Sequence, residues 1–355
     1  MGHLDSNPII CTDLQEITCC DLDWSLLNGA NVLISGGSGL LGSYLVKSLL
    51  MLNLIHDLDI RVICLTRNLE SVKKRLSSCL TNPNLDVLIH DIANPLPDGF
   101  INAEYVIHAA SQASPRFYGV DPVGTLKANT LGTSHLLDYC VRSKSRRFLF
   151  FSSGEVYGVT QNPNSPISET DYGYLDPTKV RSCYGESKRI GETMCASWAH
   201  QFGLHTSVVR PFHTYGPGLD LDDGRVFADF VRDVVLARNI SLKSDGLAKR
   251  PFCYIADATR GFFTVLLKGL WGEAYNIANP YADVSIRELA NTLRDLYPDR
   301  VTRVDFINQP TDHTYMKSPI QQATPSIDKI MQLGWNPEIG INEGFSRTIE
   351  SFLCS

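Results

Sequence analysis

The stretch Gly36-Gly37-Ser38-Gly39-Leu40-Leu41-Gly42 decides the fold of this 355-residue chain. It directly follows a short apolar run, 31–35, typical of a buried strand, and it opens a segment with helical spacing at 40–52. Glycine is needed where the chain turns tightly and where backbone approaches a pyrophosphate, and the free N–H groups of the following helix attract that anion. The spacing Gly-x-x-Gly-x-x-Gly after a strand and before a helix therefore predicts a dinucleotide-binding loop.

Apolar runs of strand length alternate with helical segments beyond this loop. The runs expected to form strands are 60–65, 87–90, 105–108 and 147–152, and a long helix is expected at 125–142. Strands that alternate with helices imply right-handed crossovers and a parallel sheet with helices on both faces. We therefore predict an α/β fold, a Rossmann doubly wound parallel sheet with a smaller, mostly helical C-terminal substrate lobe.

The chain is expected to divide into three parts. Residues 1–30 form an N-terminal extension without clear periodicity, and 31–214 form the dinucleotide-binding Rossmann domain. Beyond Pro217 helical segments such as 286–296 dominate, so 215–355 is predicted to be the substrate-binding lobe. Some strand exchange back to the first domain is expected near 250–262.

Composition limits the classes of partner. With 32 Lys+Arg against 38 Asp+Glu the net charge is −6, which argues against nucleic acid or an anionic membrane as a partner. The ten cysteines include no C-x-x-C pair and no His at ligand spacing, so we predict no metal site and no disulfide framework. Reduced thiols, the lack of a signal peptide and the interrupted apolar stretch 40–55 favour a cytoplasmic protein without a membrane span.

The second strand leaves the choice of dinucleotide open. It ends Leu65-Thr66-Arg67-Asn68, with no carboxylate for the adenosine ribose. Arg67 could meet a 2′-phosphate, which would favour NADP, or it could be an exposed loop residue. Asp91 and Ile92, after the third strand, are better candidates for contacting the adenine, although Asp91 is also a suitable helix N-cap.

A catalytic pair is indicated by Tyr184-Gly-Glu-Ser-Lys188. Residues four apart lie on one face of a helix, and an ammonium beside a phenol is expected to lower the tyrosine pKa. The hydroxyl of Ser153, in the segment 152–158 after the fifth strand, can hydrogen-bond the reacting substrate oxygen. Ser153, Tyr184 and Lys188 follow the glycine loop in this order, and chance is a poor explanation for the combination.

Seven segments carry a resemblance to known proteins: 108–115, 125–133, 153–158, 180–189, 214–217, 223–226 and 250–257. On these motifs the chain resembles the extended short-chain dehydrogenases/reductases, the NAD-dependent epimerase/dehydratase family acting on nucleotide sugars. The match runs from about residue 31 almost to the C-terminus. Within the family it is most similar to the UDP-glucuronate decarboxylases, or UDP-xylose synthases.

The resemblance implies a role for each matching residue. Tyr184 would be the base at the sugar 4-hydroxyl, assisted by Lys188 and Ser153, and Glu155 occupies the position of a catalytic glutamate that simple 4-epimerases usually lack. The cofactor, NAD with NADP not excluded, would be bound by Gly36, Ser38, Gly39, Leu40, Leu41, Gly42, Thr66, Arg67, Asp91, Ile92, Ala109, Ala110, Ser111, Tyr184, Lys188 and Thr214. The substrate would be bound by Lys127, His213, Arg225, Val226 and Arg250.

The implied reaction oxidises the sugar transiently at C4 and most resembles decarboxylation of UDP-glucuronate. The alternatives are a nucleotide-hexose 4,6-dehydratase and a 4-epimerase. A cofactor-sensing binding protein on the same fold would tend to lack Tyr184 or Lys188, and both are present. The resemblance implies two partners. One is a nucleotide sugar, with UDP as the expected nucleotide. The other is a second copy of the chain, paired through the helices predicted at 125–142 and 184–201.

Four departures from the decarboxylase pattern lie close to the expected site. Gly154 replaces a residue that is usually Ser, His213 replaces Asn, and Gly218 replaces Arg. Gln321 and Gln322 replace a basic pair. These changes leave the sugar and the nucleobase open.

Overall fold

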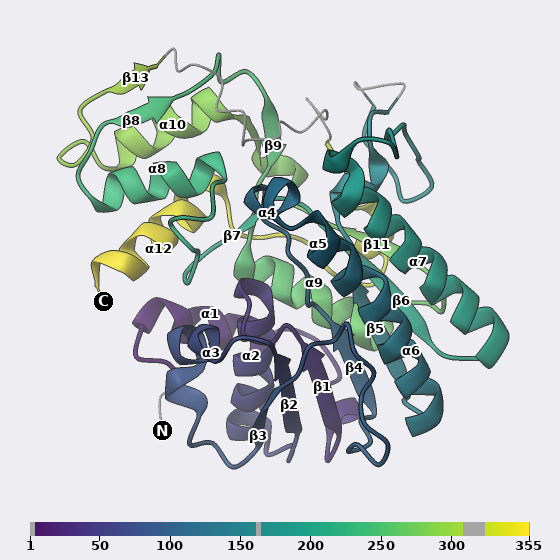
Figure 1. Cartoon of the computed structure of the whole chain (residues 1–355). Helices are drawn as coiled ribbons and strands as arrows, with labels where there is room; N and C mark the ends of the chain where they lie inside the picture. Colours follow the sequence, from purple (N-terminus) through teal and green to yellow (C-terminus); the bar gives the residue numbers. More distant parts are fainter. Residues whose placement is uncertain (1–3, 161–164, 308–323, 355) are drawn as a thin grey trace.

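A seven-stranded parallel sheet runs through the computed structural model, which describes residues 4–160, 165–307 and 324–354 (Figure 1). The strand order is β11-β6-β5-β4-β1-β2-β3, with the glycine-loop strand β1 near its middle. The strands are β1 (Asn31–Ser35), β2 (Arg61–Thr66), β3 (Leu85–Ile89), β4 (Tyr105–His108), β5 (Arg147–Phe151), β6 (Thr206–Pro211) and β11 (Ala274–Ile277). This order reverses between β1 and β4, where doubly wound sheets form their binding crevice.

Successive side chains of each central strand enter different cores. Leu33, Ile63 and Phe150 belong to one apolar cluster, whereas their neighbours Ile34 and Cys64 belong to the other. A strand alternates its side chains between the two faces, so both faces of the sheet are buried. The sheet thus needs helices on each side, as the sequence predicts.

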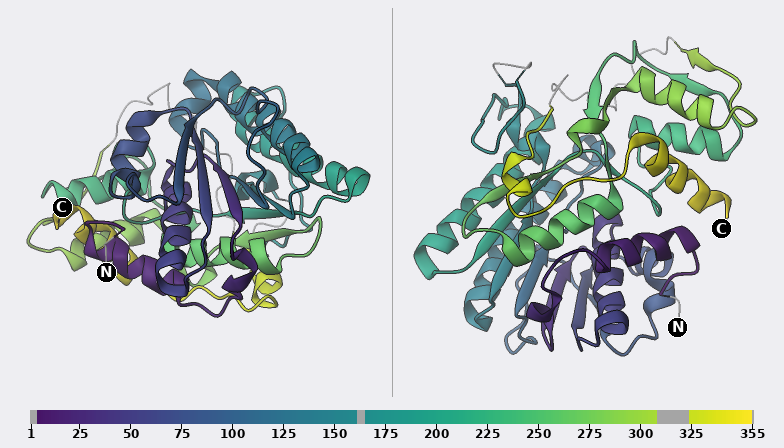
Figure 2. Two further views of the ribbon diagram at one scale, coloured as in Figure 1. Left: turned by 90° about the horizontal axis from the view of Figure 1, so that it is seen from below. Right: turned by 180° about the vertical axis from the view of Figure 1, so that it is seen from behind.

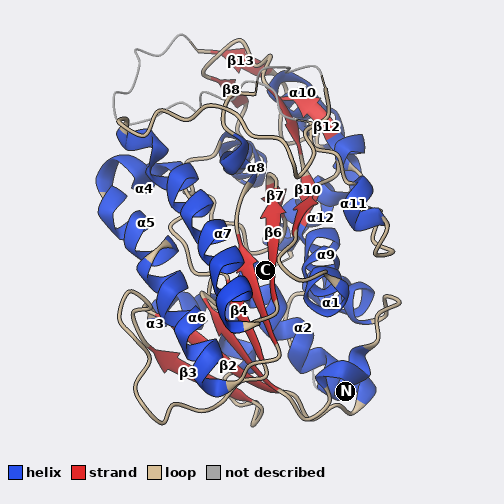
Figure 3. Ribbon diagram, turned by 90° about the vertical axis from the view of Figure 1, so that its right-hand side faces the viewer, coloured by secondary structure: helices blue, strands red, loops and turns tan. Residues whose placement is uncertain are grey.

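Two helical layers provide that cover (Figure 3). Helices α5, α6 and α7 lie against one face, and α2 and α9 against the other. The helices associated with the sheet are α2 (Leu40–His56), α3 (Leu69–Leu76), α4 (Pro115–Val120), α5 (Pro122–Asn129), α6 (Leu131–Ser143), α7 (Cys183–Phe202), α9 (Ile255–Lys268) and α11 (Asp328–Met331). The 3-10 turns are η1 (Trp24–Leu27), η2 (Ser77–Cys79), η3 (Gly154–Tyr157), η4 (Val180–Ser182) and η5 (Pro280–Ala282). The predicted Rossmann fold class is confirmed.

The single helix expected at 125–142 is wrong. The chain forms two helices, α5 and α6, separated at Thr130. The hydroxyl of Thr130 donates to the Leu126 carbonyl at 2.7 Å, and that of Thr133 to the Asn129 carbonyl at 2.6 Å. Threonine hydroxyls that bond to carbonyls of the preceding turn bend helices, which accounts for the break.

The C-terminal part forms a smaller lobe above the sheet in Figure 1. Its elements are β7 (Thr214–Tyr215), α8 (Val226–Val235), β8 (Ile240–Leu242), β9 (Lys249–Pro251), β10 (Cys253–Tyr254), β12 (Asp283–Ser285), α10 (Ile286–Leu296), β13 (Val304–Phe306) and α12 (Ile341–Leu353). Its strands form only two-stranded pairs among the described residues. The segment 250–262 contributes the start of helix α9, which covers one face of the central sheet, and it adds no strand to that sheet. The strand from the C-terminal part that joins the central sheet is β11.

The N-terminal segment contains an ordered helix, α1 (Pro8–Thr18), which the sequence does not predict. Asn7 caps it, and α1 packs on α2, α9 and α12, so the first and last helices of the described chain lie side by side (Figure 2). Its carboxylate Asp13 is fully buried and accepts hydrogen bonds from Tyr44 of α2 and Tyr254 of β10. Arg347 of α12 donates to the same carboxylate at 3.0 Å.

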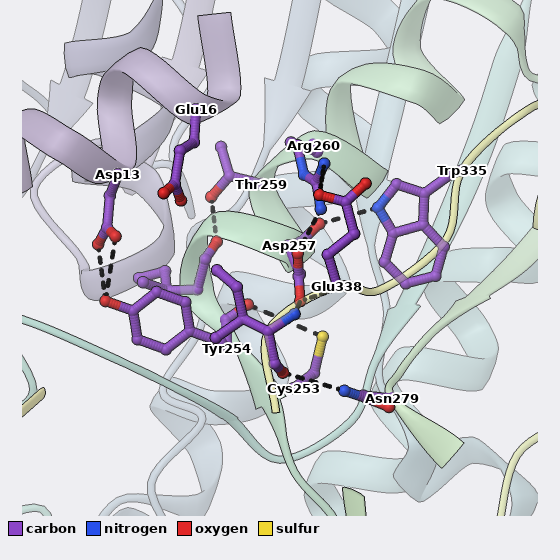
Figure 4. A network of polar contacts seen from close by, with 12 residues as sticks. Asp13, Glu16, Cys253, Tyr254, Asp257, Thr259, Arg260, Asn279, Trp335 and Glu338 are labelled. Atoms are coloured by element: carbon purple, nitrogen blue, oxygen red, sulfur yellow. Dashed lines mark hydrogen bonds and ion pairs between the residues drawn. The ribbon is translucent and has the colours of Figure 1, made fainter. Parts of the chain in front are cut away.

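A second polar network fixes the C-terminal segment on α9 (Figure 4). The buried Asp257 carboxylate accepts hydrogen bonds from the backbone N–H groups of Glu338 and Ile339, while Trp335 donates to the Asp257 carbonyl at 2.9 Å.

Among the described residues, no helix is long and apolar enough to cross a membrane.

Candidate active site

The glycine loop turns sharply between β1 and α2. Gly36 has φ +73°, and a Cβ there would lie 2.6 Å from the backbone of Ala110. A Cβ on Gly42 would lie 2.2 Å from the Gly36 carbonyl oxygen. Both positions therefore require glycine, and the loop leaves backbone exposed at the N-terminus of α2, with Leu40 and Leu41 in its first turn. This is the geometry that a pyrophosphate needs.

The ends of β2 and β3 lie beside this loop. The Thr66 hydroxyl hydrogen-bonds the Ser38 hydroxyl at 2.7 Å. Arg67 is exposed and lies 4.0 Å from the Asp91 carboxylate, which also caps the turn through the Ala93 N–H. Ile92 has its side chain in the core, so only its backbone is free to face a ligand.

Arg75 is a basic residue whose position the sequence does not reveal. Its guanidinium donates to the carbonyls of Ser38, at 3.4 Å, and Gly218, at 3.3 Å. Burial lowers the pKa of Arg75. Arg75 thus brings positive charge to the glycine loop next to Gly218, the position at which the resemblance leads us to expect an arginine.

The segment after β4 closes over the loop. The Ala109 N–H donates to the Ser35 carbonyl at 3.1 Å, and the Ala110 N–H to the Ser35 hydroxyl at 3.4 Å. The Ser111 hydroxyl is buried and has no hydrogen-bond partner among the described residues. Such a group is suited to a bound ligand.

Tyr184 and Lys188 lie buried on one face of α7, directed toward the end of β5. The Lys188 ammonium is 5.8 Å from the centre of the Tyr184 ring and donates to the Phe151 carbonyl at 2.6 Å. Ser153 follows β5, and its side chain acts on Tyr184 to lower the tyrosine pKa. The structure therefore brings together the serine, tyrosine and lysine that the sequence pairs.

The expected lowering of the Tyr184 pKa is wrong for this geometry. Burial raises the pKa of Tyr184 to about 12, although the Ser153 side chain acts in the opposite direction. Burial also lowers the pKa of Lys188 to about 7, so a buried ammonium is a weaker source of positive charge than spacing alone implies.

Glu155 is bound by an arginine that the sequence does not single out. Arg181 Nη2 donates to both carboxylate oxygens of Glu155, each at 3.1 Å. The guanidinium lies 4.8 Å from the centre of the Tyr118 ring, which stacks on Tyr184 with centroids 5.1 Å apart. Arg181 Nε is buried without a partner among the described residues. In the sequence, the only feature that indicates a role for Arg181 is its position three residues before Tyr184.

The C-terminal lobe contributes cations around His213. Arg225, at the N-cap of α8 before Val226, pairs with Asp223, and Arg250 lies on β9. Burial, together with the charges of Arg250 and Arg225, lowers the pKa of His213 to about 3.

The remaining predicted residues are Thr214, buried on β7, and Lys127, exposed on α5. His213 has φ +29°, an unusual conformation for a residue other than glycine or asparagine.

The departures at Gly154 and Gly218 have structural counterparts. A Cβ on Gly154 would lie 2.5 Å from the Phe212 ring, and Gly218 has φ +81°, which disfavours the usual arginine. Gln321 and Gln322 lie outside the described residues.

Comparisons with known proteins give consistent matches. Residues 32–278 match the model of the NAD dependent epimerase/dehydratase family. UDP-glucuronic acid decarboxylase 6 of Arabidopsis thaliana is 33% identical over 322 residues, covering 90% of this chain and 88% of that protein. UDP-glucuronic acid decarboxylase 1 of Danio rerio is 31% identical over 323 residues, covering 90% of this chain and 72% of that protein.

Solved structures share the fold at lower identity. UDP-glucuronic acid 4-epimerase from Bacillus cereus, in complex with UDP-glucuronic acid and NAD, has a TM-score of 0.77 and 22% identity, over 91% of this chain and 99% of that chain. dTDP-glucose 4,6-dehydratase from Bacillus anthracis, in complex with NAD, has a TM-score of 0.74 and 20% identity, over 92% of this chain and 97% of that chain.

Proposed function

The chain belongs to the NAD-dependent epimerase/dehydratase family, and on this premise we propose that it decarboxylates UDP-glucuronate. The family assignment confirms NAD as the predicted cofactor and an enzyme of nucleotide-sugar chemistry as the predicted class. The observation that carries the proposal is the meeting of Ser153, Tyr184 and Lys188 with the Glu155–Arg181 ion pair beside the glycine loop.

The residues around the glycine loop fit NAD. Glycines at 36 and 42 leave room that any Cβ would fill, and the start of α2 attracts a pyrophosphate. The Arg67 charge lies 4.0 Å from the Asp91 carboxylate, which favours a ribose hydroxyl over a second phosphate. When bound, NAD supplies a nicotinamide that accepts a hydride from the sugar C4 and later returns it.

Tyr184 takes the proton of the sugar 4-hydroxyl in this mechanism, and Ser153 hydrogen-bonds the same oxygen. The raised Tyr184 pKa keeps the phenol protonated, so the residue can take a proton only as a phenolate that nearby positive charge stabilises, and Lys188 is the cation on its own helix face. The lysine therefore has to be protonated when the tyrosine acts.

The resulting 4-keto group makes the sugar C6 carboxylate a β-keto acid. The C5–C6 bond breaks, carbon dioxide leaves, and the bonding electrons pass into the C4 carbonyl as an enolate, which fixed donors stabilise. C5 then takes up a proton. Glu155 is proposed to serve at this end of the sugar, held in place by Arg181.

The anionic parts of the substrate are proposed to lie between the two lobes. Arg225 and Arg250 offer guanidinium groups, which suit phosphate and carboxylate equally well. His213 is neutral at physiological pH because its pKa is about 3, so it contributes a hydrogen bond rather than a charge.

The test is incubation of the purified chain with UDP-glucuronate and NAD, followed by mass spectrometry of the nucleotide products. We expect carbon dioxide with UDP-xylose or a 4-keto pentose, and none from a Tyr184→Phe variant. A 4-keto-6-deoxy product from a neutral nucleotide hexose would instead indicate a 4,6-dehydratase. A C4 epimer without loss of carbon would indicate a 4-epimerase, and either result without uronate turnover would overturn the proposal.

The chain is further proposed to act as a cytoplasmic homodimer. The surface of α5 and the adjoining helices leaves large apolar side chains exposed, among them Val123 at 57%, Leu131 at 45% and Ile190 at 44%. The ten cysteines, all in described segments, form no disulfide, which suits a reducing compartment. Sedimentation of the parent and of Ile190→Lys tests the dimer, and a monomeric parent at micromolar concentration would contradict it.

A further inference from the structure

Helix α7 faces the end of β5 with three side chains spaced four residues apart. Tyr184 is the first of them, and the second, Lys188, donates to the Phe151 carbonyl at 2.6 Å. One turn further, Glu192 accepts a hydrogen bond from the Ser152 hydroxyl at 2.5 Å. The two predicted catalytic residues of α7 therefore share their helix face with a third residue that points at the same segment.

Glu192 is in turn bound by a buried arginine on β6. Arg210 is 1% exposed, and its Nε and Nη2 donate to the two Glu192 carboxylate oxygens at 2.9 and 2.6 Å. This two-point geometry fixes the carboxylate in direction as well as in position. Because the arginine is buried, its charge depends on Glu192 for compensation.

Arg210 also reaches the far end of the segment 152–157. Its Nη1 donates to the Tyr157 hydroxyl at 2.8 Å and to the Glu169 carbonyl at 3.0 Å. Tyr157 donates onward to Asn276 of β11 at 2.6 Å and ends η3, the turn that carries Glu155. The segment 152–157 is thus tied at its first residue by Glu192 and at its last by Arg210.

We propose that the Glu192–Arg210 ion pair positions the segment 152–157, so that Ser153 and Glu155 keep their places relative to Tyr184. Both are positioning residues, because Glu192 acts through Ser152 and Arg210 through Tyr157. The roles of Ser153, Glu155 and Tyr184 rest on the proposed function, whereas the coupling of the ion pair to the segment does not.

The test uses the full chain with three variants. Ser152→Ala removes one link and leaves the ion pair intact, and Glu192→Gln removes the charge. Ser197→Ala is the matched control, because Ser197 is an exposed residue of the same helix whose hydroxyl donates to the Thr193 carbonyl at 2.8 Å, away from the segment 152–157. We expect kcat for UDP-glucuronate to fall about tenfold or more in the first two variants, with KM within about twofold of the parent and the control unchanged.

A readout that needs no turnover separates this inference from the proposed function. Crystal structures of the parent and of Ser152→Ala are expected to show Ser153 and Glu155 displaced from Tyr184 in the variant. If the parent turns over no nucleotide sugar, the proposed function fails and these structures decide the inference. Parental kcat in Ser152→Ala and Glu192→Gln, or an unmoved segment 152–157 in the variant crystal, would overturn it, and Ser152→Ala remains informative if Glu192→Gln does not fold.

Discussion

Arg181 binds both carboxylate oxygens of Glu155 at 3.1 Å, and its guanidinium lies over the Tyr118 ring, which stacks on Tyr184. One cation therefore links the proposed base to the acidic residue beside it. A planar guanidinium can hold a carboxylate and cover a ring together, which an ammonium cannot do. The orientation of Glu155 depends on this arginine.

Replacing Arg181 tests whether turnover depends on the orientation of Glu155. In Arg181→Lys, Glu155 loses its fixed orientation, so kcat for UDP-glucuronate is expected to fall about 10- to 100-fold. Steady-state kinetics measures this, and Lys179→Met, which removes an exposed cation two residues away, should behave as the parent. Equal kcat in Arg181→Lys and the parent would show that the ion pair has no part in turnover.

Much of this arrangement can be predicted from local sequence, because its decisive parts are local. The glycine loop and the Tyr184–Lys188 pair each lie within a few residues, so spacing alone determines which side chains share a turn or a helix face. Arg181 and Tyr118 meet only through packing of α4 against η4, and neither segment's sequence indicates the contact. The pKa of Tyr184 depends on burial, which follows from the complete fold.

In the fold, too, some features follow from local sequence and others depend on contacts between distant segments. Alternating apolar runs predict the parallel sheet, but the break at Thr130 depends on hydroxyl bonds that compete with the helix. Helix α1 is not predicted because its inward face carries Asp13, and a buried carboxylate interrupts the apolar period of Ile10, Leu14 and Ile17. The partners of that carboxylate come from three distant segments of the chain.

The glycine at 154 is expected to be required by its neighbour. Since a Cβ would lie 2.5 Å from the Phe212 ring, Gly154→Ser should lower the free energy of unfolding by about 1–3 kcal/mol. Urea denaturation measures this, and adding Phe212→Leu should restore part of the loss. Gly340→Ser is the control, because a Cβ there meets nothing within 4 Å at the N-cap of α12. Unchanged stability in Gly154→Ser would show that the ring moves freely.

His213 is expected to make stability depend on pH in the acid range. Its pKa is about 3 in the folded chain, against an ordinary value of 6.5 for the unfolded chain, so between these values the unfolded chain binds more protons. The contribution of His213 to stability therefore rises as pH increases from about 3 to 6.5 and then levels off. Between pH 7 and pH 5, His213→Asn should lose less stability than the parent, by about 1–2 kcal/mol. Asparagine also tolerates the positive φ of this position, so the variant is expected to keep the backbone conformation. If the stability of the parent and of the variant changes with pH in the same way, the low pKa of His213 is contradicted.

Asp13 is expected to connect the N-terminal helix to both lobes. Asp13→Ala leaves Arg347 and two tyrosine hydroxyls without their buried acceptor, and we expect a loss of about 3–5 kcal/mol of unfolding free energy. The exposed Asp21 provides the matched control, since Asp21→Asn changes an aspartate outside this network.

The pH dependence at Asp13 has the opposite sign to that at His213. Burial raises the pKa of Asp13 from 3.8 to about 6, so between these values Asp13 binds more protons in the folded chain and its contribution to stability falls as pH rises. Asp13→Asn removes this titration. The stability of the parent relative to Asp13→Asn should therefore be greatest below about pH 4 and decrease by up to about 3 kcal/mol by pH 7. Chemical denaturation of both proteins across this range measures it, and a difference independent of pH would show that Asp13 stays ionised throughout.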